Sequence, residues 1–116
     1  MKIAIPVDET KSNVCVSFAR APFFLFEEEG NVEILENEAA QAQGGAGLKA
    51  AQFLVDQNAD VLITVRCGEN AAKVLKMAEM EVYKSQGDNA LEQVSMLKEG
   101  KLEKLTKFHA GYHGLR

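Results

Sequence analysis

A short, uninterrupted apolar run, Val61 to Val65, constrains the fold of this chain more than any other feature. A strand that is apolar on both faces has to be covered on both, which is typical of parallel strands in α/β domains. One helix is predicted before this run, over residues 47–58, and another after it. The second helix has its apolar residues at i, i+3, i+4 and i+7: Ala71, Val74, Leu75 and Ala78. The alternation of helices and strands along this part of the chain predicts right-handed crossovers and a parallel sheet.

Four further strand-like runs complete the expected sheet: 3–7, 23–28, 31–36 and 81–84. The middle two flank a turn at Gly30 and predict a β-hairpin, which adds one antiparallel strand. A third helix is predicted with Asp88 or Asn89 as its cap, and Glu92, three residues after Asn89, would complete a capping box. We therefore expect one α/β domain, residues 1–105, with a mixed five-stranded sheet flanked by helices. Residues 106–116 are expected to form a C-terminal tail.

Composition narrows the possible partners. The 116 residues are 47% hydrophobic and 26% charged, an ordinary balance for a single globular domain. A net charge of −4 and an isoelectric point near 5.2 argue against nucleic-acid binding, which depends on basic contacts to phosphates. No apolar run suits a signal peptide or a spanning helix, so we expect a cytoplasmic protein with no membrane partner. Cys15 and Cys67 are then expected to be reduced thiols.

Ligands of open α/β sheets bind outside the carboxyl ends of the strands. Three loops should meet there: residues 8–20, 66–70 and 85–89. Arg66, Cys67 and Gly68 join a buried strand to a helix start, where free backbone amides suit an anion or a thiolate. We expect Cys67 to ionise more easily there than a free cysteine and to be able to bind a soft metal. The alternative is that Cys67 packs as a small hydrophobic residue.

Other residues are weaker candidates. Arg20, beside the start of a strand, is a candidate anion ligand or a surface charge. His109 and His113 are four residues apart, a spacing that would place both on one metal if the segment were helical, but its glycines favour a loose tail. Cys15 lies in the long first loop and could approach the other cysteine. The glycines at 44–47 do not match a phosphate-binding loop and are interpreted as a flexible linker.

Four stretches occur in an order that is characteristic of one family: KIAIPVD at 2–8, SFARAPFF at 17–24, GAGLKAA at 45–51, and the strand–turn–helix over 61–75. Over residues 1 to about 105 the chain resembles the dinitrogenase iron–molybdenum cofactor biosynthesis family, with its NifX-like and NifB C-terminal-like domains. The FxRAPFF motif is the most specific part. The resemblance implies a ribonuclease-H-like fold without nuclease activity, and binding or carriage of iron–molybdenum cofactor or its iron–sulfur precursor.

The chain departs from the pattern of this family at several positions. Ser17 and Gln43 stand where members often have histidine, and Ala19 where they often have glycine. The turn over residues 66–70, usually glycine-rich in the family, contains Cys67 here. Cys67 is therefore a candidate replacement for the missing histidine ligands.

The leading hypothesis is a non-enzymatic carrier of an iron–sulfur or iron–molybdenum type cluster, a monomer or weak homodimer, acting with a metallocofactor donor or acceptor protein. Such clusters are anionic, which suits positive side chains and a helix start. The candidate cofactor-binding residues are Arg20, Arg66, Cys67 and Gly68, and the candidate metal ligands are Cys67, Cys15, His109 and His113.

Two alternatives come from other classes of function, because the fold alone does not determine the activity. One is a metal-free protein-interaction or regulatory module. The other is a degenerate ribonuclease-H-type hydrolase, for which Asp8 and Glu9 are candidate metal-binding carboxylates without clear partners on later strands.

Overall fold

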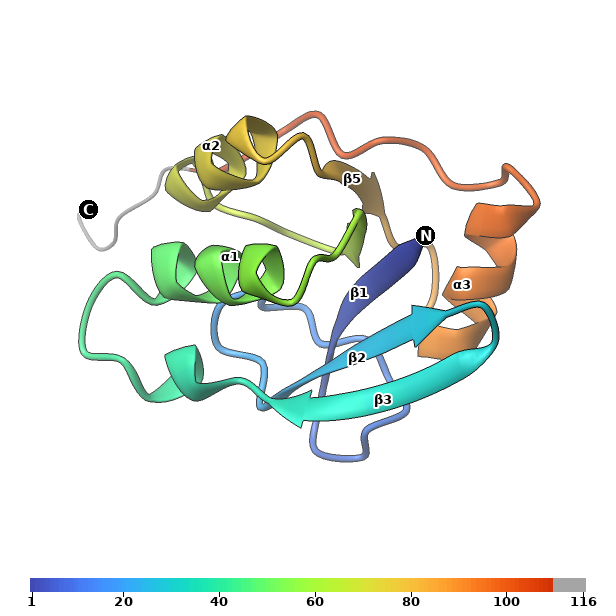
Figure 1. Ribbon diagram of the computed structural model, residues 1–116, viewed down its shortest axis with the longest axis horizontal. Helices are drawn as coiled ribbons and strands as arrows, with labels where there is room; N and C mark the ends of the chain where they lie inside the picture. The colour runs from blue at the N-terminus through green and yellow to red at the C-terminus, as the bar shows by residue number, and fades with distance from the viewer. Residues whose placement is uncertain (110–116) are drawn as a thin grey trace.

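Residues 1–109, which the computed structural model describes, form one mixed sheet of five strands in the order β3-β2-β1-β4-β5 (Figure 1). The strands are β1 (Lys2–Val7), β2 (Phe23–Glu28), β3 (Asn31–Glu36), β4 (Val61–Thr64) and β5 (Glu81–Lys84). β1 pairs in parallel with β4, and β4 with β5, whereas β2 is antiparallel to both of its neighbours. β2 is thus the one strand of these five that runs against the others, and the predicted sheet is confirmed.

Helices cover both faces of this sheet (Figure 1). They are α1 (Ala46–Asp56), α2 (Glu69–Met77) and α3 (Ala90–Lys98), and a short 3-10 helix, η1 (Glu38–Gln41), precedes α1. α1 and α2 pack together on one face, and α3 lies on the other. This is the ribonuclease-H-like arrangement that the resemblance implies. In the described part of the chain, no helix has the length and apolar character needed to cross a membrane.

The core is divided in two because successive side chains of a strand point to opposite faces of the sheet. Ala4 of β1 lies on the face under α1 and α2, together with Phe24, Phe26 and Leu62. Its neighbours Ile3 and Ile5 lie on the other face, where they join Leu25, Val61 and Ile63 beneath α3. β1 and β4 are therefore buried on both faces of the sheet. For β4, this is what the run at 61–65 predicts.

An aromatic cluster fills the larger half of the core. The ring of Phe24 lies 5.6 Å from that of Phe18 and 6.1 Å from that of Phe53, measured between centroids, with tilted planes. Such tilted pairs add to the free energy gained by burying the rings. Phe18 belongs to the loop after β1, so this contact fixes the loop against the sheet.

The predicted third helix and its cap are confirmed. The side chain of Asn89 accepts a hydrogen bond from the Glu92 amide at 2.8 Å, which satisfies one of the free amides at the start of α3. After α3 the chain turns at Gly100, whose φ is +74°, and runs back along the outer edge of β5. Residues 106–109, predicted as the start of a tail, continue from that edge to the start of α2.

The aromatic cluster predicts the size of one stability change. We expect Phe24→Ala to lower the free energy of unfolding by about 3–5 kcal/mol, because the fully buried ring leaves a cavity that the packed sheet cannot fill. Met77→Ala is the control, since that side chain is 86% exposed, and it should change stability by no more than about 0.5 kcal/mol. Urea unfolding followed by circular dichroism measures both. Equal effects of the two substitutions would contradict the assignment of Phe24 to the core.

Candidate functional site

A cavity of about 790 Å³ lies at the carboxyl ends of β1 and β4. Its volume is in the range of small-ligand sites in proteins. The lining residues belong to four segments: 16–20 after β1, 43–48 at the start of α1, 66–68 with 70–71 at the start of α2, and His109. The predicted location, outside the carboxyl ends of parallel strands, is where this cavity lies.

The central pairing of the sheet brings these segments together. β1 and β4 are parallel neighbours, so the loops that follow them leave the sheet at the same edge. The two loops then run side by side, since Ser17 and Arg66 form a further parallel bridge. α1 and α2 both begin at this edge, at the left of Figure 1. Residues that are far apart in the sequence therefore share one cavity wall.

The third loop expected at this edge lies beside the first loop but away from the cavity wall. Residues 85–89 pack against the first loop, where the Val14 amide donates to Asp88 O at 2.7 Å and the Ala90 amide donates to Ser12 O at 2.9 Å. They do not line the cavity. The first loop therefore meets both of the others, but the prediction that residues 85–89 share the ligand site was wrong, because hydrogen bonds to residues 12–14 hold them away from the cavity.

The described walls of the cavity carry positive charge and no carboxylate. Arg20 and Arg66 line it, while no aspartate or glutamate is among the described lining residues. This contrasts with the chain as a whole, whose net charge is −4. A cavity wall that contains arginines and no acidic side chain favours the binding of anions.

The starts of both helices strengthen this preference. Gly45 caps α1 and Gly68 caps α2, and neither cap makes a side-chain hydrogen bond to the helix. α3 and η1, which do not line the cavity, begin with capping asparagines instead. Helix starts carry partial positive charge and backbone amides that bind anions. Two such starts, from α1 and α2, contribute to one cavity.

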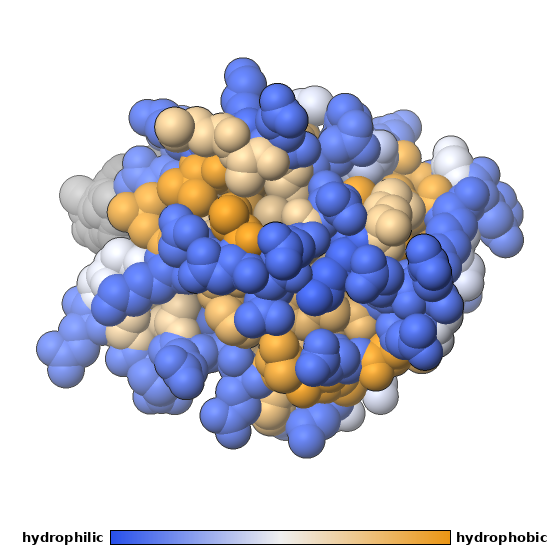
Figure 2. Space-filling view, viewed as in Figure 1, coloured by the Kyte–Doolittle hydropathy of each residue, from blue (hydrophilic) through white to orange (hydrophobic). Residues whose placement is uncertain are grey.

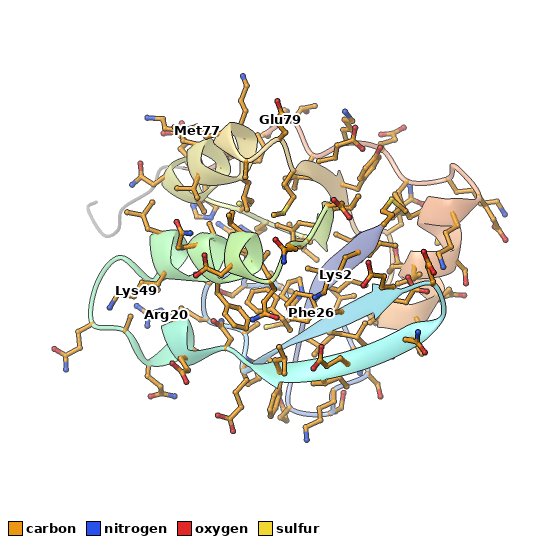
Figure 3. The ribbon with its side chains drawn as sticks, viewed as in Figure 1. Lys2, Arg20, Phe26, Lys49, Met77 and Glu79 are labelled. Carbon is orange, nitrogen blue, oxygen red and sulfur yellow. The ribbon has the colours of Figure 1, made fainter. Side chains whose placement is uncertain are left out.

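The two arginines are held in different ways. The Arg20 guanidinium donates from Nη1 to Ala40 O at 3.0 Å and to Ala42 O at 2.7 Å, which fixes the chain just before the glycine segment. Figure 3 shows Arg20 at the same end of the molecule as Lys49 of α1. The exposed Arg66 side chain makes no hydrogen bond or ion pair with any residue that the structure describes. The Arg66 guanidinium, unlike that of Arg20, therefore has all its hydrogen-bond donors available to a ligand.

Cys67 is buried, and this corrects one prediction. The residue is 1% exposed and belongs to the core under α1 and α2, and its Sγ donates a hydrogen bond to Gly68 O at 3.6 Å. Burial raises the pKa of the Cys67 thiol to about 12. The prediction that the helix start makes this cysteine easier to ionise was wrong, because the loss of hydration outweighs the helix charge. The alternative, a small buried apolar residue, describes Cys67 as the structure has it.

Of the other candidate metal ligands that the structure describes, His109 lies beside Cys67 and Cys15 does not. Cys15 is half-buried, its amide donates to Pro6 O at 2.8 Å, and it does not line the cavity. His109 does line it, whereas His113 lies outside the described residues. Over residues 1–109, no three histidine, cysteine or acidic side chains come close enough to hold a metal ion. Asp8, the candidate carboxylate for hydrolysis, accepts a hydrogen bond from the Thr10 amide at 2.9 Å and is not in the cavity wall.

The glycine segment is part of the site, which the sequence interpretation missed. Residues 44–47 form a wall of the cavity and lead directly into α1. Gly45 has a φ of +67°, a left-handed conformation that favours glycine, so this segment is a defined turn rather than a linker. No local sequence signal identifies this turn, because a glycine run is equally typical of a flexible linker.

Apolar side chains complete the rim of the cavity. Val16 and Leu48, both of which line it, are 56% and 44% exposed. Figure 2 shows hydrophobic surface over the left part of α1 and α2, beside polar residues. A cavity with cationic walls and an exposed apolar rim is therefore open to solvent at this end of the molecule.

Comparison with known proteins identifies the family of this chain. The model of a family described as "Dinitrogenase iron-molybdenum cofactor" matches residues 1–100. A candidate NifB protein from Thermotoga, assigned to the DUF35 family, is 37% identical, with 96% of this chain and 98% of that chain covered and a TM-score of 0.78. The resemblance stated from the sequence is confirmed by both findings. No curated protein matches the chain.

Two further solved structures share the fold at lower identity. The apo form of the orange protein from Desulfovibrio gigas has a TM-score of 0.84 at 24% identity, with 90% of this chain and 92% of that chain covered. A candidate dinitrogenase from Methanocaldococcus jannaschii has a TM-score of 0.72 at 22% identity, with 91% and 95% covered. At these identities the likeness concerns the fold alone.

The buried thiol predicts a dependence of stability on pH. In the folded protein Cys67 keeps its proton up to about pH 12, whereas in the unfolded chain it loses the proton above pH 9.0. Between these values the unfolded state binds fewer protons, so stability falls as pH rises. We expect the stability of wild type relative to Cys67→Ala to be constant below pH 9 and to fall by about 1.4 kcal/mol by pH 10. Urea unfolding of both proteins at pH 8 and pH 10 measures this, and an unchanged difference would contradict the burial of the thiol.

Proposed function

The chain belongs to the dinitrogenase iron–molybdenum cofactor family, and from this premise we propose that it binds and carries an anionic iron–sulfur or iron–molybdenum type cluster. In this proposal it is a carrier in metallocofactor assembly or insertion and not a catalyst. The supporting observation is the cavity at the starts of α1 and α2, which has arginine in its walls and no described carboxylate.

The cluster would be held chiefly by charge and hydrogen bonds. Arg66 supplies a guanidinium whose donors are available, and the amides at the starts of α1 and α2 supply further donors. Arg20 keeps the glycine wall in place through Ala40 and Ala42, so its contribution is mainly to shape. This division of roles refines the hypothesis that both arginines contact the cluster.

Two residues in the wall have atoms that bind soft metals. Cys67 offers a sulfur and His109 an imidazole, and both line the cavity. Because the thiol is protonated in the structure, a metal bound through Cys67 would have to displace its proton. Two protein ligands leave most of a cluster's coordination to its own sulfides or to a partner, which suits a cargo that is passed on.

Transfer to or from another protein requires an accessible mouth. The exposed Val16 and Leu48 at the rim offer apolar surface on which a cluster donor or acceptor could dock. The proposed partner is therefore a protein of metallocofactor assembly.

Anaerobic reconstitution tests the proposal. The protein is mixed with ferrous iron and sulfide and desalted, and bound iron, sulfide and the visible spectrum are measured. We expect wild type to retain a cluster and Arg66→Ala to bind it about ten- to a hundredfold more weakly, because one charge-assisted contact is lost.

Lys73→Ala is the matched control. It removes one exposed positive charge from α2 without touching the cavity wall, so it should bind like wild type. Failure of wild type to retain any cluster would favour the metal-free interaction module. Equal weakening by Lys73→Ala and Arg66→Ala would show that net charge, and not this cavity, controls binding.

A further inference from the structure

The last described residues of the chain lie across the start of α2. Residues 107–109, here called the strap, pair with the turn between β4 and α2 through a bridge between Gly68 and His109. The His109 amide donates to Cys67 O at 3.3 Å, and the Glu69 amide donates to His109 O at 2.9 Å. The second bond uses one of the amides that begin α2. The strap thus occupies part of the helix start that a bound anion could use.

The His109 ring rests on a glycine. A Cβ atom at Gly68 would lie 3.2 Å from Cε1 of His109, which is closer than ordinary van der Waals contact. Gly68 has a φ of −78°, so its backbone conformation is open to other residues. A side chain at this position would therefore have to displace the imidazole.

The strap also lines a second cavity. This smaller cavity, of about 220 Å³, is lined by all three strap residues and shares Arg66, Cys67 and His109 with the larger one. Cys67 borders both cavities and is nevertheless 1% exposed. Two backbone hydrogen bonds join His109 of the strap to this turn, one to the Cys67 carbonyl and one from the Glu69 amide. The strap is therefore bonded to the backbone of Cys67, and both cavities that Cys67 borders are lined by His109.

We propose that the strap is a gate: when residues 107–109 leave the start of α2, the two cavities join and the Cys67 thiol and the Glu69 amide become accessible. Segments held by few backbone hydrogen bonds open locally without global unfolding. Lys107 and His109 are exposed, and Phe108, packed against the core, remains as the tether. The purpose of the gate, admission of a cluster to Cys67, rests on the proposed function, whereas the gating itself does not.

Thiol labelling without any cluster tests the gate. The full-length protein is treated with iodoacetamide, and the labelling rates of Cys67 and Cys15 are measured separately by peptide mass spectrometry. We expect Gly68→Ala, which pushes the ring away, to raise the rate at Cys67 about tenfold, the effect of a shift of about 1.4 kcal/mol in the opening equilibrium. His109→Ala, which removes the ring, should raise it as well.

Two internal controls make the result specific. Gly47→Ala adds a methyl group in the wall of the same cavity at 3.7 Å from Ala71 Cβ, an ordinary contact, and should leave the Cys67 rate unchanged. Cys15, which does not line either cavity, should react at the wild-type rate in every variant. An unchanged Cys67 rate in both strap variants overturns the gate, and so does an equal rise at both cysteines. If the strap variants raise the labelling rate of Cys67 but wild type retains no cluster on reconstitution, the gate stands and the proposed function is rejected.

Discussion

The parallel pairing of β1 with β4 determines where every feature of the candidate site lies. Two parallel neighbours release their following loops at the same edge of the sheet, so residues near position 17 and residues near position 66 become adjacent. α1 and α2 cover one face and begin at that edge, which brings together two helix starts that have no side-chain cap (Figure 1). Without this pairing, Arg66 and the glycine segment would have no common cavity.

Cys67 shows how two physical effects at one residue can be ranked by size. A rise in the pKa of the thiol from 9.0 to about 12 corresponds to about 4 kcal/mol against the thiolate. A charge at a helix start is typically stabilised by about 0.3–1 kcal/mol. Burial therefore decides the protonation of this cysteine in the structure as it stands. A role for the thiol in binding then depends on a change that exposes it, which displacement of the strap could provide.

The strands and helices could be predicted because their signals are local. The run at 61–65, the i, i+3, i+4 spacing of α2 and the Asn89 cap each depend on neighbouring residues, and the observed sheet and helices follow them. The family resemblance added the expectation of a ribonuclease-H-like fold, whereas the strand order itself comes from the structure. Arg20, Arg66, Cys67 and Gly68 were predicted as site residues, and the structure places all four in the wall of one cavity. Whether they bind a cluster stays a prediction.

The remaining features depend on contacts between distant parts of the chain. The glycine segment forms a wall because Gly45 adopts a left-handed conformation and Arg20 holds the preceding carbonyls, and no local pattern announces either fact. The loop at 85–89 is held by residues 12–14, and the burial of Cys67 results from core packing beneath α1 and α2. His109 reaches the cavity only because residues 101–105 follow the edge of β5. Tertiary packing decided each of these outcomes.

Paramagnetic broadening tests the central claim, that this cavity binds an anionic cluster, most directly. Amide signals of the isotope-labelled protein are recorded before and after anaerobic loading with an iron–sulfur cluster. The account predicts that signals from residues 16–20, 43–48 and 66–71 are lost while those of β3 and α3 persist. Loss of signals centred on another surface, with the cavity residues unaffected, would contradict it.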